Sequence, residues 1–304
     1  MTRAVHHGMF RRPGFVNYKR KSAPSDLYER SAIMKPTIKH KRLAAVILLW
    51  AVLPFAAYCA STPYTGRTRL ILTTEAQENE MGEKSFREFM AKAAPSRNRS
   101  YVDMVERVGK RLAVVANKPD YKWEFAVVES NEVNAFCLPG GKIVFYTGIM
   151  PMFENEAELA IVMGHEIAHA VLRHGGERMS QAMAANFLGS VLGALTEKDG
   201  KRELYMAAFG GITTVGLILP YSRKHEYEAD ETGTLFSAKA GYAPEAAVNF
   251  WQKMMKQGGA RPPEFLSTHP SDTKRVEYLR KLMPKMKQVY SSSAEKHEYG
   301  EKLR

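Results

Sequence analysis

The segment Gly164-His165-Glu166-Ile167-Ala168-His169 constrains this chain more than any other. Side chains four residues apart on a helix lie one turn apart on the same face, so His165 and His169 can share one zinc ion. Glu166 lies one step round the helix, where it reaches a water at the metal rather than the metal itself. A chance match of five residues is the competing interpretation, and the strongly amphipathic run around the motif disfavours it. The motif predicts a zinc site with a general base.

The sequence around this motif has the signals of a helix. Asn155 and Glu158 form a capping pair at its start, and Gly175-Gly176 is expected to close it. The pattern therefore predicts a helix over residues 156 to 174.

A catalytic zinc ion needs a third protein ligand and an open fourth position. His174 follows His165 by nine residues, and about 100° per residue turns it to the opposite face of the predicted helix. The metzincin pattern H-E-x-x-H-x-x-G-x-x-H also fails, because Leu172 and Gly175 stand where Gly and His are needed. We expect His174 to act as a cationic or capping group at the helix C-terminus.

A second acidic segment offers the missing ligand. In His225-Glu226-Tyr227-Glu228-Ala229-Asp230, Glu226 and Asp230 are four residues apart and share a helix face. One of them can bind zinc, and the other can accept the free N–H of a zinc-bound imidazole. Taken alone, such a segment is more often a solvated acidic face. Together with the histidine motif it indicates a metal site built from two helices.

The remaining patterns predict a mostly helical α+β protein. Helical periodicity or capping signals mark four further helices, and β-branched and aromatic residues mark strands joined across the turn Pro139-Gly140-Gly141. The predicted helices are 75–93, 101–115, one from Pro220 to Gly241, and 244–256; the predicted strands are 123–128, 142–146 and an edge strand at 133–138.

The N-terminal part resembles a secretory leader. The basic stretch KPTIKHKR at 35–42 precedes the apolar run LAAVILLWAVLPFAAYCA at 43–60. Three outcomes stay open: a lipoprotein with Cys59 acylated, cleavage after a small residue near Cys59, or an uncleaved anchor, since about 18 apolar residues barely span a bilayer. Residues 34–60 are thus expected to export the chain and associate it with a membrane, and 1–33 to be a misread start or a disordered extension.

The body of the chain, residues 61–290, is expected to form one domain, followed by a loose polar tail at 291–304. An apolar stretch at 204–219 is interpreted as a core helix, with membrane contact as the alternative. Residues 1–58 contain eleven Lys or Arg but only Asp26 and Glu29, so they supply +9 of the net charge of +12. The rest lacks the basic surface of a nucleic-acid binder. The two cysteines, Cys59 and Cys137, form no metal-binding pair and no disulfide framework.

Five segments resemble metallopeptidase family 48, a gluzincin family, and are most similar to its bacterial periplasmic and mitochondrial inner-membrane quality-control branch. They span nearly the whole body: CASTPYTGRTRLILTTEAQE at 59–78, NAFCLPGGKIVFYTG at 134–148, HEIAHAVLRHGGER at 165–178, PYSRKHEYEAD at 220–230 and STHPSDTKR at 267–275. The resemblance implies a zincin-like fold with a small β-sheet whose edge strand lines the cleft.

The resemblance also implies roles for particular residues. It makes Glu226 the third zinc ligand and Asp230 the partner of a zinc-bound imidazole, with Glu228 pointing away. It makes His269 and Arg275 donors to the oxyanion of the tetrahedral intermediate. In some periplasmic relatives the equivalent histidine instead fills the open zinc position, so we also hold the hypothesis that His269 keeps the site latent.

The same resemblance implies a substrate strand and a function. Asn134, Ala135 and Phe136 would pair with the backbone of a polypeptide substrate, although an ordinary core strand is the alternative. The chain is expected to be a zinc metalloendopeptidase of the bacterial periplasm or cell envelope, with one zinc ion per chain, that degrades misfolded or misassembled envelope proteins. The rival hypothesis is a non-catalytic zinc-binding assembly or chaperone-like factor.

Overall fold

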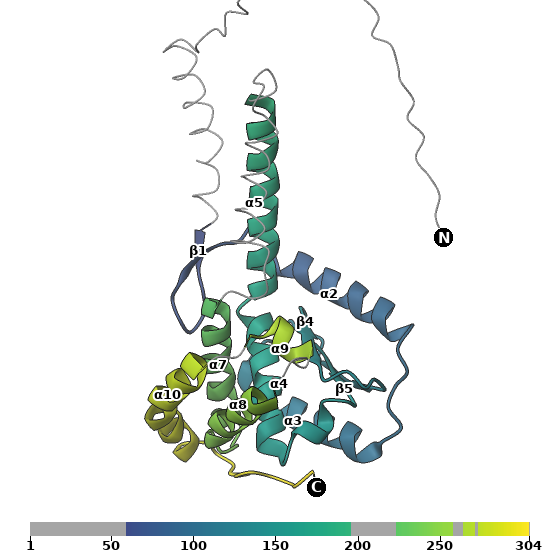
Figure 1. The fold of residues 1–304 in the computed structure, drawn as a ribbon, viewed down its shortest axis with the longest axis vertical. Coiled ribbons are helices and arrows are strands. Elements are labelled where there is room, and N and C mark those ends of the chain that lie inside the picture. The colour runs from purple at the N-terminus through teal and green to yellow at the C-terminus, as the bar shows by residue number, and fades with distance from the viewer. Residues whose placement is uncertain (1–58, 196–222, 258–263, 271–272, 304) are drawn as a thin grey trace, which may run out of the picture. The chain divides into compact units, whose positions relative to one another are not determined.

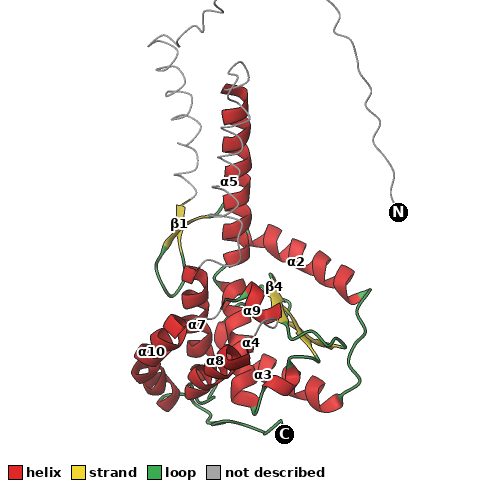
Figure 2. Cartoon of the chain, viewed as in Figure 1, coloured by secondary structure: helices red, strands yellow, loops and turns green. Residues whose placement is uncertain are grey.

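The computed structural model describes residues 59–195, 223–257, 264–270 and 273–303. Over these residues the chain is mostly helical with two small β-sheets, which confirms the predicted α+β class (Figure 1 and Figure 2). The elements are β1 (Cys59–Ser61), β2 (Thr68–Leu70), α2 (Glu75–Met90), α3 (Arg99–Ala116), β3 (Glu124–Val128), β4 (Ala135–Leu138), β5 (Lys142–Tyr146), the 3-10 helix η1 (Met150–Met152), α4 (Glu156–Val171), α5 (His174–Leu195), α7 (Arg223–Lys239), α8 (Glu245–Gln257), α9 (Glu264–Thr268) and α10 (Thr273–Ser291).

The described helices include none that is both long and apolar enough to cross a bilayer. Two of the sequence predictions concern other parts of the chain. The leader, up to residue 58, and the apolar stretch at 204–219 lie outside the described residues.

The larger sheet has the strand order β3-β5-β4, with β3 parallel and β4 antiparallel to β5. The predicted turn joins β4 to β5, and Gly140 and Gly141 both have φ of +81° there, a conformation that glycine adopts without strain. β4 lies at one edge of the sheet, as the sequence predicts, and pairs with β5 only along one side. Among the described residues its other side has no strand partner, so it is an open edge.

All of the residues of α4 are buried, so this helix is the centre of the core. Its N-terminus is formed as predicted, because the Asn155 side chain accepts a hydrogen bond from the amide of Glu158. Helices α3, α7 and α8 pack around it (Figure 1). A helix buried on every face is held in one place, which suits an element that carries a site.

The end of α4 differs from the prediction of one helix through residue 174. The helix ends at Val171, and Arg173 has φ of +55°, so the chain turns before α5 begins at His174. The Arg173 guanidinium donates to both carboxylate oxygens of Glu78, at 2.7 and 3.0 Å. Gly176 does not close a helix: a Cβ there would lie 2.0 Å from Oε1 of Glu78. Tertiary contacts with α2 thus override the local helix pattern.

The C-terminal part contains two further differences. Helices α9 and α10 were not predicted, and α10 continues through Pro284. The expectation of a loose tail is wrong for residues up to 303, since the tail binds the start of α4. The amides of Glu156 and Ala157 donate to the carbonyl oxygens of Glu301 and Tyr299, at 2.9 and 3.1 Å. The tail therefore satisfies donors at a helix N-terminus that have no partner within the helix.

Candidate metal centre and catalytic site

Two glycines bring the ligand-bearing helices together. A Cβ built on Gly164 of α4 would lie 2.7 Å from the carbonyl oxygen of Gly233 on α7, so the two backbones touch there. This close crossing places Glu226, near the start of α7, opposite His165 and His169. The shared site predicted for the two helices exists as a spatial cluster.

The cluster consists of four buried side chains whose ligand atoms all lie within 4.8 Å of one another: His165, His169, Glu226 and His269. The Nε2 atoms of His165 and His169 are 3.1 Å apart. Oxygens of Glu226 lie 3.4 Å from each of these nitrogens. Tetrahedral zinc with bonds of about 2.0–2.1 Å would space its ligand atoms about 3.3 Å apart. The residues therefore fit a zinc ion in donor type and in spacing.

The Asp230 carboxylate, which Arg275 holds, contacts the ring nitrogen of His165 that faces away from the cluster. Nδ1 of His165 lies 3.1 Å from Oδ1 of Asp230, as expected for the partner of a metal-bound imidazole. Arg275 forks onto both oxygens of Asp230 at 2.7 Å and reaches Oε2 of Glu226 at 2.9 Å. The guanidinium also lies 3.9 Å above the Trp251 ring. These contacts direct Arg275 at the carboxylates and differ from the oxyanion role that the resemblance implies for it.

The charges of the cluster favour a cation. Burial lowers the pKa of His169 well below its usual range, which leaves this imidazole neutral. Burial would raise the pKa of Glu226, but Arg275 and the surrounding imidazoles outweigh it and hold the carboxyl ionised. Burial also lowers the pKa of His165, yet hydrogen bonds with Asp230 and Glu226 raise it to about 9. Metal binding would therefore replace a proton on His165.

Glu166 lies beside the cluster and is buried. Burial raises the pKa of its carboxyl, and nearby His269 and His165 oppose this effect. The backbone of Cys137 in β4 also acts to lower the pKa of this carboxyl. A carboxylate whose pKa is raised toward neutral pH is suited to general base catalysis. Glu166 thus lies next to the predicted zinc ligands, and its role as general base stays a prediction.

His269 lies between the ligand cluster and Glu166. Its Nδ1 is 3.3 Å from both Nε2 of His165 and Oε1 of Glu226, and its Nε2 is 3.4 Å from Oε1 of Glu166. The ring packs against Phe265 of α9, with centroids 4.8 Å apart. In this arrangement His269 belongs to the cluster of candidate ligands and contacts the predicted base, and its latency role stays a hypothesis.

His174 differs from what was expected of it, and Glu228 lies outside the metal cluster, as expected. Because α5 starts at His174, this residue does not cap the end of α4; its Nδ1 lies 2.9 Å from Nδ1 of His169. Glu228 is buried, with Oε2 3.1 Å from Nε2 of His174. Arg67 and Glu177, which the sequence did not single out, join them in an ion-pair network. Only long-range pairing could have revealed these two residues.

In the predicted substrate strand, the backbone groups of every second residue face away from β5. The carbonyl of Asn134 accepts from Tyr146 of β5, so Asn134 and Phe136 turn their backbone groups toward β5. The backbone groups of Ala135 and Cys137 then face the open edge, toward Glu166. The side-chain oxygen of Asn134 accepts a hydrogen bond from the amide of Ala135 at 2.9 Å.

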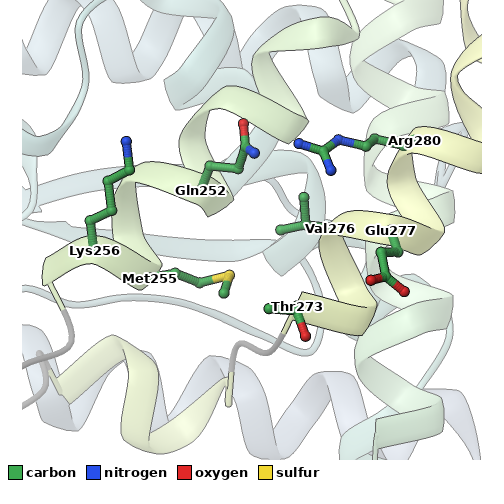
Figure 3. A pocket seen from close by; sticks show the side chains of 7 residues that line it. All are labelled: Gln252, Met255, Lys256, Thr273, Val276, Glu277 and Arg280. Carbon is green, nitrogen blue, oxygen red and sulfur yellow. The ribbon is translucent and has the colours of Figure 1, made fainter.

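A separate pocket lies between α8 and α10 (Figure 3). It has a volume of about 380 Å³, and no residue of the metal cluster lines it. Its lining residues are Gln252, Met255, Lys256, Thr273, Val276, Glu277 and Arg280. We therefore place the candidate chemistry at the buried cluster and not in this pocket.

Comparison with known proteins agrees with the geometry. Residues 101–283 match the model of a protein family described as Peptidase family M48. The mitochondrial metalloendopeptidase OMA1 of Schizosaccharomyces pombe is 34% identical over 73% of this chain and 66% of that protein. The mitochondrial metalloendopeptidase OMA1 of Homo sapiens is 32% identical over 80% of this chain and 49% of that protein. The beta-barrel assembly-enhancing protease of Escherichia coli is 28% identical over 83% of this chain and 53% of that protein. The chain thus spans 49% to 66% of the length of these relatives.

Proposed function

The chain belongs to peptidase family M48, and from that premise we propose that it is a zinc-dependent metalloendopeptidase. The observation that carries the proposal is the convergence of His165, His169 and Glu226 at the spacing of zinc ligands, with Glu166 beside them. Nε2 of each histidine and the carboxylate of Glu226 would hold the ion.

The chain's own residues divide the reaction between them. A zinc ion held by His165, His169 and Glu226 would act as a Lewis acid toward the scissile carbonyl and a water molecule. Glu166 accepts the proton of that water and passes it to the leaving amine. Asp230 and Arg275 keep His165 and Glu226 in place, and the burial of the cluster excludes bulk solvent. No covalent enzyme intermediate is needed.

We further propose that His269 keeps the site latent. Catalytic zinc sites keep an open position, whereas four protein ligands close a site. His269 contacts two of the ligands and Glu166, so its displacement would open the fourth position and free the base together. The alternative role, donation of a proton to the oxyanion, would require His269 to remain where it is.

Polypeptide substrates would add to the sheet at the open edge of β4. An extended segment would form main-chain hydrogen bonds with Ala135 and Cys137, with the Ala135 amide exchanging its bond to the Asn134 side chain, and such pairing has little sequence selectivity. The segment would then run past Glu166, which touches the same strand. This mode suits a peptidase that acts on many misfolded chains.

The cellular setting is a further part of the proposal. The basic and apolar leader at 35–60 supports export to the bacterial periplasm or cell envelope, with membrane association through this segment or through lipid on Cys59. The name of the Escherichia coli relative supports a role in envelope protein quality control. The OMA1 relatives from Schizosaccharomyces pombe and Homo sapiens are named as mitochondrial proteins. Mass spectrometry of the mature N-terminus in bacteria tests the lipid anchor: an acylated Cys59 as first residue supports it, and a chain that keeps residue 58 or begins after Cys59 contradicts it.

The experiment that tests the enzymatic proposal measures zinc content and casein cleavage together. We expect one zinc ion per chain and cleavage that a chelator abolishes and added zinc restores. Bound zinc without cleavage, also in the variant His269→Ala, would instead support the non-catalytic assembly or chaperone-like factor.

A further inference from the structure

A chain of buried contacts leads away from His169 to the N-terminal part of the described body. Nδ1 of His169 lies 2.9 Å from Nδ1 of His174, and Nε2 of His174 lies 3.1 Å from Oε2 of Glu228. Both His174 and Glu228 are buried. The ring of His225 stacks on that of His174, with centroids 4.4 Å apart. The His174 ring is therefore held by contacts at its edge and at its face.

The chemistry of these groups fixes the direction of each hydrogen bond. An ionised carboxylate only accepts, so Nε2 of His174 donates to Glu228. Nδ1 of a neutral His174 is then an acceptor, and Nδ1 of His169 must donate to it. The remaining nitrogen of His169, Nε2, keeps its lone pair and faces the metal cluster. Glu228 thus selects the metal-binding tautomer of His169 through His174.

Glu228 is in turn held by the loop between β1 and β2. Nε and Nη2 of Arg67 donate to its two oxygens, each at 2.9 Å, and the hydroxyl of Thr65 donates to Oε1 at 2.7 Å. The same guanidinium forks onto Glu177 of α5 at 2.7 and 2.8 Å. A bidentate arginine fixes the plane of a carboxylate as well as its position. Arg67 therefore determines which way Glu228 presents its oxygen to His174.

We propose that Arg67 is a positioning residue for the metal site, acting on His169 through Glu228 and His174. The arrangement mirrors the one behind His165, where Arg275 forks onto Asp230. Glu228 and Asp230 both belong to α7, but Arg67 comes from the N-terminal part of the described chain and Arg275 from the C-terminal part. The metal affinity of the catalytic helix then depends on the loop at Thr62–Arg67. The inference rests on the proposed zinc site.

The test compares zinc affinity in the full-length protein and two arginine variants. Arg67→Ala removes the fork on Glu228, and Arg107→Ala is the matched control. Arg107 is similarly accessible, with 33% of its side chain exposed against 24% for Arg67, and it pairs with Glu156 and Glu301 away from the cluster. We expect both variants to unfold at lower temperature without metal. Only Arg67→Ala should weaken zinc binding, roughly tenfold, when measured by competition with a chromogenic chelator.

Three outcomes decide the inference. A folded Arg67→Ala variant with unchanged zinc affinity overturns it, and so does an equal loss of affinity in Arg107→Ala, which would mean that general destabilisation is the cause. Should Arg67→Ala fail to fold, Arg67→Lys keeps the charge and loses the fork, and its zinc affinity decides in the same way. The measurement uses no substrate, so it is separate from the proposed function: a wild-type protein that binds no zinc would contradict the zinc site itself.

Discussion

Gly164 and Gly233 touch backbone to backbone where α4 crosses α7. A Cβ on Gly164 would lie 2.7 Å from the carbonyl oxygen of Gly233, and a Cβ on Gly233 would lie 2.5 Å from the amide nitrogen of His165. Real Cβ atoms do not approach backbone atoms so closely. Helices α4 and α7 can therefore approach this closely only because residues 164 and 233 are both glycine.

Gly233→Ala should push α7 away from α4. We expect a loss of about 1–3 kcal/mol in the free energy of unfolding, because the added methyl group overpacks the crossing, together with weaker zinc binding. Thermal unfolding with and without zinc measures both effects. Gly175→Ala is the matched control, since a Cβ there meets nothing within 4 Å and the residue lies in α5. Equal stability and zinc affinity in the two variants would contradict the close crossing.

Deletion of residues 295–304 should destabilise the catalytic helix. It removes the carbonyl oxygens of Tyr299 and Glu301 that bind the amides of Ala157 and Glu156. The loss of such caps costs about 1–2 kcal/mol, which urea unfolding would detect. The control is Lys296→Ala, because the Lys296 ammonium bonds only to Ser291 and Ser293 among the described residues. An unchanged urea midpoint after the deletion would show that the tail does not support α4.

Glu177 should make stability depend on pH in the acid range. Burial acts to raise the pKa of its carboxyl, but hydrogen bonds from Arg67 and His225 outweigh burial and lower the pKa to about 2. A carboxyl with a depressed pKa contributes stability above its unfolded pKa of about 4.3, and this contribution is lost as the pH falls toward 2. Wild type should therefore melt above Glu177→Gln at pH 6, and the difference should shrink between pH 4.5 and pH 2. A difference that is constant over this range would contradict the ion-pair assignment.

His269→Ala should raise the rate of casein cleavage. The imidazole stands 3.3 Å from atoms of His165 and Glu226 and 3.4 Å from Glu166, so its removal opens the fourth position and frees the base. Phe265→Ala is a useful companion, because it removes the ring packed against His269 and leaves the imidazole present. We expect this variant to be activated less than His269→Ala. A fall in activity for His269→Ala would instead favour a role in stabilising the transition state.

The local part of the site could be predicted from the sequence. The i, i+4 spacing of His165 and His169 is a property of any helix, and the capping residues before the motif are local signals. The same spacing set Glu226 and Asp230 on one face. The edge strand was also predictable, because its β-branched neighbours and its Gly-Gly turn are local.

What could not be predicted depends on contacts between distant residues. Helix α4 ends early because Glu78 on α2 holds Arg173 in a left-handed conformation, and no pattern near residue 173 shows this. The acidic segment around Glu228 is typical of a solvated helix face, and only the structure shows that Arg67, 161 residues away, binds Glu228. The family resemblance implied an oxyanion role for Arg275, whereas its guanidinium binds Asp230, 45 residues away in the sequence. Local propensity indicates which segments form helices and strands, and tertiary contacts determine where those elements end and which side chains pair.

The substitution Glu166→Gln tests the central claim most directly, and it is best made both in wild type and in the His269→Ala background. The amide keeps the size of the carboxylate and cannot accept a proton from water. We expect one zinc ion per chain, as in the parent protein, and no casein cleavage. A Glu166→Gln variant that cleaves casein as fast as its parent would contradict the account, whatever its zinc content.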